Sequence, residues 1–573
     1  MNGAHYILQF LEQKHVHSVF GYPGGAIMPL YDALLDFSIK HYLARHEQGA
    51  AFSAVGYARS TNSVGVCFGT SGPGATNLIT SMADAKLDSV PLLVITGQVA
   101  KSSMGSDAFQ EVDVLGLSLS VCKHSELITD LEELPEALAR CWELAQEGRP
   151  GPVLVDVPKD ILLQEMPAEL LNLSASASAS ASASASASAS ASATVVEDVS
   201  EHQAQIDAIN AVLATSEKPL LYVGGGVAMA NAIPELRDFM ASCNMPSVAT
   251  LKGLGCVSGD HPYYLGMLGM HGLPTANIAV QECDVLLVVG ARLDDRATGK
   301  LDEFAPHAKV IHIDVDAAEI SKRRTADISI QADVKAILPF LKVTKNCSEW
   351  QAYLGNIKAE KAMQYSDFSA SARPDAPSVL HRLSEKLPDN SVVAVDVGQH
   401  QMWVAQHMSF TTPCNHLTSG GLGTMGFGLP AAIGAKVARP NNTVVSVSGD
   451  GSFMMNVQEL GTLKRYGIPV KIVIMDNQRL GMVKQWQELF HEERYSETDL
   501  SCNPEFCALA KVFGLEAREL TDNNQTEEAL TWLLETEGAA LLHVRLDEQQ
   551  NVWPIVPPNT ANHKMWEQPS CTD

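Results

Sequence analysis

Asp450 and Asn477 each follow an apolar run, and 27 residues separate them. Asp450 stands in the turn 449–452, GDGS, whose glycines let a backbone come close to a phosphate. A carboxylate, a carboxamide and a main-chain carbonyl, for which Arg479 is the best placed residue, are oxygen ligands that Mg²⁺ accepts. No Gly-Lys-Ser/Thr follows, so the turn is not an ordinary phosphate loop. The pair predicts a magnesium ion that bridges the aspartate and a diphosphate.

The two side chains would meet only if neighbouring parallel strands presented them at one edge of a sheet. Their spacing fits a single strand–helix–strand crossover with a helix in 456–467, and we expect a second helix to begin at Ser452. A Gly-Asp-Gly turn by itself could equally cap a helix. The asparagine at crossover distance favours the metal site.

Apolar runs that end in glycine or polar turns occur in three groups along the chain. They are 63–77, 90–98 and 151–160, then 218–226, 283–295 and 308–316, then 391–399, 442–452 and 469–477. Such runs are typical of buried parallel strands. We therefore predict an α/β fold of three successive α/β domains with mostly parallel sheets, with ligands beyond the carboxyl ends of the strands.

A Ser-Ala repeat at residues 174–193 interrupts this order. It has no large apolar side chain and no charge, so a single copy has nothing to bury, and we predict a flexible linker without chemistry. The predicted domains are 1–165, a linker at 166–196, 197–345 and 370–550, followed by a tail at 551–573.

The overall charge argues against two classes of partner. With 66 acidic and 40 basic residues, a formal net charge of −26, the chain has no basic excess to bind nucleic acid or an anionic membrane. It also lacks an uncharged apolar run of about 20 residues, the length of a membrane span. Its 11 cysteines form no Cys-x-x-Cys pair, and its N-terminus is unlike a signal peptide, so we expect reduced thiols and a cytoplasmic protein.

Several stretches resemble one enzyme family. "GDGSFMMN" with "DNQRLGMV" is similar to the signature of thiamine-diphosphate enzymes. "FGYPGGAIMPLYDAL", "RHEQGAAFSAVGYAR", "GLGTMGFGLPAAIGA" and "GMVKQWQELF" resemble motifs of the catalytic large subunit of acetohydroxyacid (acetolactate) synthase, most closely the enterobacterial isozyme II type. The resemblance runs from about residue 18 to 556, and the Ser-Ala repeat departs from it. It implies a pyrimidine-binding domain, a central Rossmann-like domain and a diphosphate-binding domain.

Glu47 matches the family's catalytic acid. An acid that begins a helix is often only a solvated cap, but here the resemblance implies a carboxyl that hydrogen-bonds the aminopyrimidine ring and promotes loss of the thiazolium proton. The resemblance also assigns thiamine-diphosphate contacts to Glu47, Thr70, Pro73, Asn77, Gln110, Val397, Gly398, Gln399, His400, Gly423, Met425, Gly449, Asp450, Gly451, Ser452, Asn477, Leu480, Gly481, Met482 and Val483. Of these, Met425 could instead be simple core packing. The implied metal ligands are Asp450, Asn477 and Arg479.

The stretch "LLYVGGGVAMANA" does not complete a dinucleotide fingerprint, because Met229 stands where glycine or alanine is required. The family nevertheless binds FAD across this unit, without net redox chemistry. The matching positions are Arg149, Gly224, Gly225, Gly226, Thr250, Leu251, Lys252, Met267, His271, Gly290, Arg292, Asp294, Arg296, Asp314, Asp316 and Asp333.

The resemblance implies that the enzyme decarboxylates pyruvate and transfers the two-carbon unit to a second pyruvate or to 2-oxobutanoate, in isoleucine, valine and leucine biosynthesis. Arg292 would bind the second carboxylate and Trp486 would select 2-oxobutanoate, although Trp486 could also be a packed core aromatic. The other positions matching the substrate channel are Ala26, Phe109, Lys159 and Met482. Glu47 and Asp450 stand in different units. In the family two chains pair so that the cofactor spans a subunit interface, and the resemblance therefore implies a homodimer or homotetramer with active sites at that interface. A separate small regulatory subunit is also expected.

Two alternatives stay open at this point. One is a related thiamine-diphosphate flavoprotein such as a pyruvate oxidase, against which "GMVKQWQ" and "DAFQEVD" argue. The other is a cofactor-binding but inactive regulatory homologue, which the intact Glu47, Asp450 and Asn477 disfavour.

Overall fold

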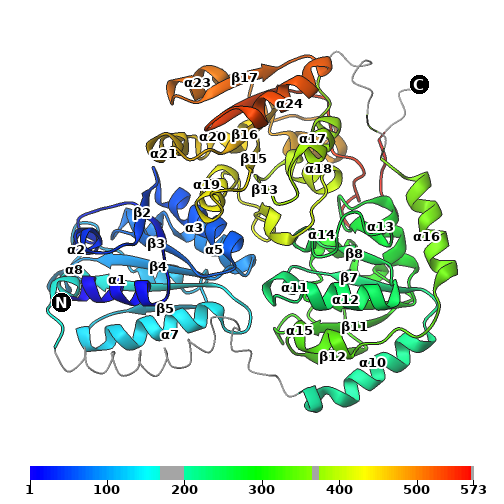
Figure 1. The fold of residues 1–573 in the computed structure, drawn as a ribbon, viewed down its shortest axis with the longest axis horizontal. Coiled ribbons are helices and arrows are strands. Elements are labelled where there is room, and N and C mark those ends of the chain that lie inside the picture. Colours follow the sequence, from blue (N-terminus) through cyan, green and yellow to red (C-terminus); the bar gives the residue numbers. More distant parts are fainter. Residues whose placement is uncertain (168–198, 364, 366–372, 569–573) are drawn as a thin grey trace.

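A computed structural model of the protein describes residues 1–167, 199–363, 365 and 373–568. Within them the chain forms three six-stranded sheets covered by helices (Figure 1). All strand pairs in the three sheets are parallel. The predicted fold class, three α/β units with parallel sheets, is therefore confirmed. The Ser-Ala repeat lies outside the described residues.

The first sheet has the strand order β2-β1-β3-β4-β6-β5. Its strands are β1 (Ser18–Gly21), β2 (Lys40–Leu43), β3 (Gly65–Gly69), β4 (Leu92–Gln98), β5 (His124–Leu127) and β6 (Pro152–Pro158). The helices of this unit are α1 (Gly3–Gln13), α2 (Met28–Ala33), α3 (Glu47–Thr61), α4 (Pro73–Thr76), α5 (Ile79–Leu87), α6 (Val114–Ser118), α7 (Leu134–Gln146) and α8 (Lys159–Leu163). Strands β3, β4 and β6 are buried along their whole length, which explains their continuous apolar sequence.

The second sheet has the order β12-β11-β10-β7-β8-β9. Its strands are β7 (Pro219–Val223), β8 (Ser247–Ala249), β9 (Tyr264–Met267), β10 (Val285–Val289), β11 (Lys309–Asp314) and β12 (Ile328–Gln331). Its helices are α10 (Gln203–Thr215), α11 (Gly226–Met229), α12 (Ile233–Cys243), α13 (Pro274–Glu282), α14 (Asp295–Thr298), α15 (Val334–Ile337) and α16 (Ser348–Glu360). Strands β8 and β9 follow β7 on one side of the sheet, and β11 and β12 follow β10 on the other side. The strand order therefore reverses between β7 and β10. Such a topological switch point, beyond the carboxyl ends of the strands, is the usual ligand position in these sheets.

The third sheet has the order β14-β13-β15-β16-β18-β17. Its strands are β13 (Val392–Val395), β14 (His416–Thr418), β15 (Val444–Gly449), β16 (Lys471–Asp476), β17 (Glu516–Leu520) and β18 (Ala540–Arg545). Its helices are α17 (Ala376–Lys386), α18 (Gln399–His407), α19 (Gly428–Ala438), α20 (Asp450–Met454), α21 (Leu460–Tyr466), α22 (Gly481–Phe490), α23 (Phe506–Val512) and α24 (Thr526–Glu535). Its switch point lies between β13 and β15.

Helices α3 and α19 join the first and third units. Gly56 packs on the main chain of Ala431, and Gly434 on that of Ser53, with no room for a Cβ at either glycine. The rings of Phe52 and Phe427 lie 5.3 Å apart beside this crossing. Small residues thus let the two helices approach closely. Because α3 is buried on most sides, its sequence shows no clear amphipathic pattern.

Across the described residues, no helix combines the length and the hydrophobicity needed to cross a membrane. The ten cysteines in the described part of the chain are all free thiols.

Candidate active site

Asp450 and Asn477 lie at the carboxyl ends of neighbouring strands. β15 and β16 pair in parallel, with Gly449 opposite Met475, so the two polar residues follow at the same edge. Helix α20 begins at Asp450 and not at Ser452, which corrects our expectation by two residues. The cause is local: Gly449 is extended and its N–H donates to Ser452 Oγ at 3.1 Å, so the turn closes earlier.

The carboxylate of Asp450 is buried without a positive partner. Its side chain is 2% exposed and accepts a hydrogen bond from Asn503 Nδ2 at 3.3 Å. Burial, and then the nearby charge of Asp476, raise the pKa of Asp450 to about 8. No lysine, arginine or histidine of the described residues forms an ion pair with it. A buried carboxyl of this kind is costly unless a cation neutralises it, so the residues present fit a divalent metal.

Asp476, at the end of β16, has its own partners. It lies 2.7 Å from both His543 Nε2 and Arg545 Nη1. Although burial raises the pKa of Asp476, the hydrogen bonds from His543 and Arg545 outweigh it and lower that pKa. His543 and Arg545 of β18 thus bind Asp476, and Asp450 is left without an ion-pair partner among the described residues and is available to a metal.

Asn477 and Arg479 complete the strand-end group. Asn477 Nδ2 donates to Gln399 Oε1 at 2.9 Å, which turns the amide oxygen away from Gln399. The guanidinium of Arg479 pairs at 2.7 Å with Asp499 and with Glu548. The side chain of Arg479 is therefore occupied, and its main-chain carbonyl is the group left for a metal.

Two further segments from other strands border the 449–452 turn. From the first turn of α18, which follows β13, His400 Nε2 accepts the Gly449 N–H at 3.2 Å. Burial lowers the pKa of His400 to about 3, so its ring is neutral. From the loop after β14, Met425 Cε lies 3.7 Å from the position that a Cβ on Gly451 would take. The structure therefore brings the expected contacts Val397, Gly398, Gln399, His400, Gly423 and Met425 to the border of the expected diphosphate loop.

The start of α22 closes the same edge. A Cβ at Gly481 would collide with the side-chain amides of Gln399 and Asn477, so any larger residue there would have to displace them. Leu480 precedes the helix, and Met482 and Val483 continue it. Val483 is 50% exposed, which leaves part of this edge open.

Glu47 is the first residue of α3 and lies in the first unit. Its side chain is 9% exposed, and its Oε2 accepts a hydrogen bond from Asn77 Nδ2 at 2.9 Å. Thr70 Oγ1 accepts the Ala26 N–H at 3.3 Å, and Pro73 begins α4 just before Asn77. Gln110 has a φ of 61° and packs its main chain on Gly72, which brings it to the same turn. The first unit thus brings the residues that it was expected to contribute into neighbouring turns.

We call the Glu47 group and the Asp450–Asn477 group the two half-sites, because the side-chain hydrogen bonds named for each stay within its own unit. Glu47 is hydrogen-bonded inside the first unit, and Asp450 and Asn477 inside the third. Close to Glu47, Asn456 Nδ2 of the third unit donates a hydrogen bond to Gln48 Oε1 of the first unit at 3.5 Å.

Glycines stand at the switch point of the second sheet. Gly226 N–H donates to the Gly290 carbonyl at 2.8 Å, and neither Gly224 nor Gly226 has room for a Cβ. Gly225 lies beside Lys252, and Thr250 and Leu251 follow β8 at the same edge. Asp314 ends β11 and accepts the Asp316 N–H at 2.9 Å. Such a switch point at the carboxyl ends of parallel strands is a usual position for a dinucleotide.

The charged residues expected to contact the flavin are mostly engaged by other protein groups. Arg149 pairs with Asp316 at 3.1 Å and with Glu319 at 2.9 Å. Lys252 Nζ lies 2.6 Å from Asp88. Further flavin positions act as helix caps or are buried: Asp294 caps α14, Asp333 caps α15, and Met267 and His271 are buried.

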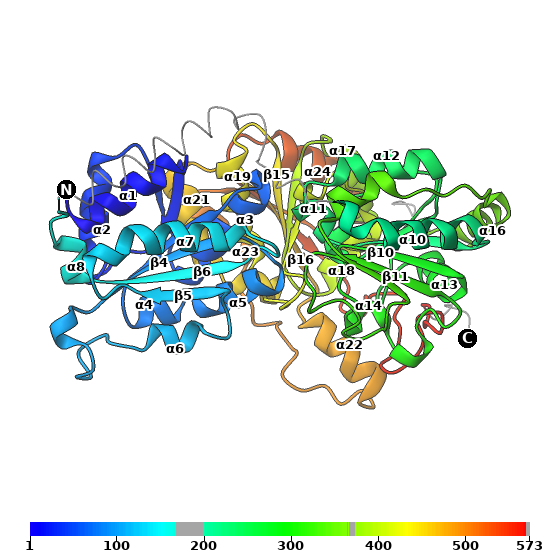
Figure 2. The same ribbon diagram turned by 90° about the horizontal axis from the view of Figure 1, so that it is seen from below.

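The expected substrate residues occupy two places. On α22, which projects beside the second unit in Figure 2, Trp486 lies under the guanidinium of Arg296, 5.9 Å from its ring centroid. Arg292 instead lies 4.0 Å from Asp294. On the first unit, Phe109 is 86% exposed, Ala26 is buried and Lys159 begins α8. The Arg296–Trp486 contact was missed by sequence reasoning, because no local spacing relates residues so far apart.

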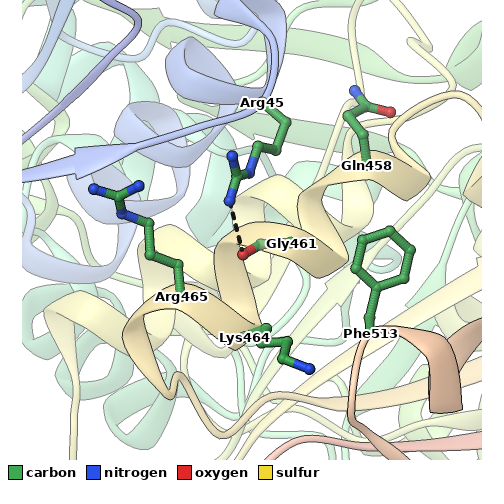
Figure 3. Close-up of a pocket in the computed structure, with 6 residues that line it drawn as sticks. All are labelled: Arg45, Gln458, Gly461, Lys464, Arg465 and Phe513. Atoms are coloured by element: carbon green, nitrogen blue, oxygen red, sulfur yellow. Dashed lines mark hydrogen bonds between the residues drawn. The ribbon is translucent and has the colours of Figure 1, made fainter.

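A cleft of about 440 Å³ lies between the first and third units (Figure 3). Its lining residues are Arg45, Gln458, Gly461, Lys464, Arg465 and Phe513, and Arg45 contacts the Gly461 carbonyl at 3.5 Å. None of these residues is among those expected to bind cofactor or substrate.

Comparison with known proteins defines the class to which this fold and site belong. Family models of the N-terminal, central and C-terminal domains of thiamine pyrophosphate enzymes match residues 1–117, 206–341 and 396–544. The chain is 55% identical to the acetolactate synthase isozyme 2 large subunit of Escherichia coli, over 99% of this chain and 100% of that protein. It is 42% identical to isozyme 1 of the same organism and 42% identical to the acetolactate synthase of Arthrospira platensis, again over nearly full length. The chain therefore belongs to the acetolactate synthase large-subunit family of thiamine pyrophosphate-dependent enzymes.

Proposed function

We propose that the protein decarboxylates pyruvate and joins the two-carbon unit to a second pyruvate, giving 2-acetolactate, or to 2-oxobutanoate, giving 2-aceto-2-hydroxybutanoate. The observation that carries this proposal is the buried Asp450, which has no ion-pair partner among the described residues, beside Asn477 at the carboxyl edge of the paired strands β15 and β16. The family membership agrees with it. The reactions belong to isoleucine, valine and leucine biosynthesis, and we place the enzyme in the cytoplasm.

Mg²⁺ would be held by Asp450, Asn477 and the Arg479 carbonyl, together with the diphosphate of the cofactor. With a metal bound there, Asp450 would face a cation and not the bare phosphate charge, so the repulsion between them would be offset. When bound, thiamine diphosphate supplies a carbon nucleophile that attacks the 2-oxoacid and stabilises the charge left by decarboxylation. Glu47 would hold a proton against the aminopyrimidine ring, and the neutral His400 would support the diphosphate turn.

A second copy of the chain would complete each active site. The apolar side chains around the two half-sites are open in one chain: Met455 is 52% exposed, Leu422 42%, Val483 50% and Phe109 86%. Exposed large apolar side chains at functional loops are typical of an interface. If Glu47 of one chain faced Asp450 of another, in a homodimer or a homotetramer, the interface would cover these apolar side chains.

Complementation between two inactive variants tests this arrangement. Glu47→Gln and Asp450→Ala chains should each be nearly inactive alone, whereas co-expression should restore about one quarter of wild-type activity. The reason is that half of randomly formed dimers are mixed, and each mixed dimer contains one intact pair of half-sites. The measurement is acetolactate formation by the purified mixture.

As control, each variant is co-expressed with a differently tagged copy of itself, which should restore nothing. A mixture that stays inactive, although size-exclusion chromatography shows mixed dimers, would show that Glu47 and Asp450 act within one chain.

FAD would lie across the switch point of the second sheet, along Gly224–Gly226, Gly290 and Asp314, in a role without net redox chemistry. The second 2-oxoacid would meet Arg292, with Trp486 favouring 2-oxobutanoate. Lys159, Phe109, Ala26 and Met482 would line its channel. Feedback control by valine would require a separate small regulatory subunit.

One reconstitution experiment tests the proposed function. The purified full chain is assayed for acetolactate with pyruvate, with thiamine diphosphate, Mg²⁺ and FAD omitted in turn, and then with 2-oxobutanoate as competitor. Activity that needs all three cofactors is expected. Anaerobic bleaching of the flavin by pyruvate at the turnover rate would indicate an oxidase instead, and cofactor binding without any acetolactate would indicate an inactive homologue. Repeating the assay with valine, with and without a small subunit, tests the regulatory partner.

A further inference from the structure

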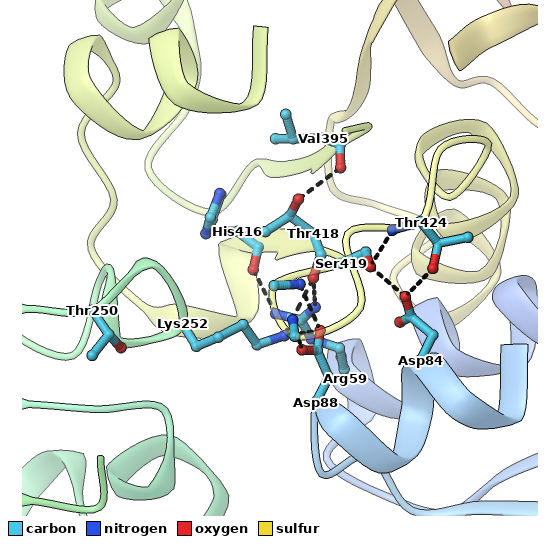
Figure 4. Close-up of polar contacts among 12 residues, drawn as sticks. Arg59, Asp84, Asp88, Thr250, Lys252, Val395, His416, Thr418, Ser419 and Thr424 are labelled. Atoms are coloured by element: carbon cyan, nitrogen blue, oxygen red, sulfur yellow. Dashed lines mark hydrogen bonds and ion pairs between the residues drawn. The ribbon is translucent and has the colours of Figure 1, made fainter. Parts of the chain in front are cut away.

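Two aspartates at the end of α5 meet the loop that carries Met425. Asp84 lies in the last turn of α5, and Asp88 follows the helix. Opposite them is the loop 419–425, which follows β14 of the third sheet (Figure 4). Both aspartates are buried, with side chains 0% and 3% exposed. The sequence shows them only as two acids one helical turn apart, and the proposed function assigns them no role.

Asp84 holds the loop through hydroxyl groups. Its Oδ2 accepts hydrogen bonds from Ser419 Oγ and, at 2.8 Å, from Thr424 Oγ1. Ser419 Oγ in turn accepts the Thr424 N–H at 2.8 Å. One serine oxygen therefore ties both ends of the segment 419–424 to the first unit.

Asp88 holds the same loop through its main chain. It accepts the Gly420 N–H at 3.1 Å and the Gly421 N–H at 2.7 Å. It also pairs with Lys252 Nζ at 2.6 Å, which comes from the second unit. Although burial raises the pKa of Asp88, the charges of Lys252 and Arg59 outweigh it, so this carboxylate is ionised. Asp84 has only neutral donors, and burial, then the charge of Asp88, raise its pKa to about 7.

A third carboxylate fixes the other end of the loop. Asp396 accepts the Gly426 N–H at 2.8 Å and the Gly428 N–H at 3.0 Å. Residues 422–425 therefore lie between two anchored points of the loop. Asp84 and Asp88 hold the loop on the N-terminal side, and Asp396 holds it on the C-terminal side. Within that span, Gly423 has a φ of 71°, and Met425 reaches toward Gly451, the neighbour of Asp450. A change in the anchoring at Ser419 would be passed on to Met425.

We propose that Ser419, Thr424 and Asp84 are positioning residues that hold Gly423 and Met425 in the conformation that binds thiamine diphosphate. The inference rests on the proposed function. It assigns Asp84, a residue of the first unit that is not among the expected cofactor contacts, a role in shaping the cofactor site of the third unit. Lys252 joins the second unit to the same anchor through Asp88.

The test uses the full chain and two conservative variants, Ser419→Ala and Thr424→Val. The probe is thiamine diphosphate with Mg²⁺, titrated by calorimetry and by acetolactate activity. Ser419→Ala should raise the half-saturating cofactor concentration about tenfold or more, and Thr424→Val by a smaller factor, because misplacing a contact group by about 1 Å is costly. At saturating cofactor, kcat should fall much less than the affinity does.

Ser391→Ala is the matched control. Ser391 is a buried serine of the same unit whose hydroxyl has no hydrogen-bond partner among the described residues. The cofactor-free melting temperature of Ser419→Ala should stay within about 4 °C of this control. A lower melting temperature with unchanged cofactor affinity would overturn the inference, because it would show a purely structural interface. If the wild-type chain itself neither binds the cofactor nor forms acetolactate, the proposed function fails too, and the two failures are distinguished by the wild-type titration.

Discussion

Replacing Glu47 with glutamine is expected to lower the rate of acetolactate formation by about 10²–10⁴-fold at saturating cofactor, the usual contribution of a positioned acid or base. Glutamine keeps the size of the side chain and can still accept from Asn77, so the first half-site should stay folded. It cannot give up or take a proton against the aminopyrimidine ring. The loss should therefore appear in kcat, while the affinity for thiamine diphosphate changes little.

Glu136→Gln is the matched control for this variant. Glu136 is an exposed acid in the first turn of α7, in the same unit, as Glu47 is in the first turn of α3. Its replacement removes the same charge from a helix start and should leave kcat within about twofold, because exposed helix-start charges are worth only a fraction of a kcal/mol. An active Glu47→Gln enzyme would remove Glu47 from the mechanism.

Replacing Asp450 with alanine is expected to raise the Mg²⁺ and thiamine-diphosphate concentrations needed for half-maximal activity by about 100-fold or more, because it removes the charged metal ligand. The chain should remain folded, because the buried carboxyl has no ion-pair partner among the described residues that the substitution would leave as an uncompensated charge. Calorimetric titration of the cofactor, with and without Mg²⁺, measures the effect. Asp522→Ala, at the helix cap after β17 in the same sheet, should leave the affinity unchanged while costing some stability.

The raised pKa of Asp450 adds a dependence on pH to this prediction. In the metal-free fold the carboxyl stays protonated up to about pH 8, so its contribution to stability is present at low pH and is lost as pH rises through that value. Mg²⁺ must displace this proton. The apparent affinity for Mg²⁺ should therefore rise by up to about tenfold per pH unit between about pH 6 and 8 and then level off. Tight binding in Asp450→Ala, or wild-type affinity independent of pH, would count against Asp450 as the ligand.

Much of the fold could be predicted because its signals are local. The runs around β3, β4 and β6 and their counterparts in the other units are continuous and apolar, which is typical of strands buried on both faces. The pairing of β15 with β16 followed from one crossover of ordinary length. The start of α20 was predicted two residues late, because the hydrogen bond from Gly449 to Ser452 depends on side-chain geometry within the turn.

The sequence by itself determined the three α/β units, the strand-end positions of Asp450 and Asn477 and the helix that begins at Glu47. Each of these depends on apolar periodicity and on spacing within about 30 residues, which the backbone converts directly into position. Only the tertiary structure decided which charges are neutralised. His543 and Arg545, from β18, take Asp476 and leave Asp450 unpaired, while Asp84 and Asp88 reach a loop more than 300 residues away. Hydrogen bonds and charge pairs between distant residues depend on which helices and strands pack together. The spacing of residues along the sequence does not predict that packing.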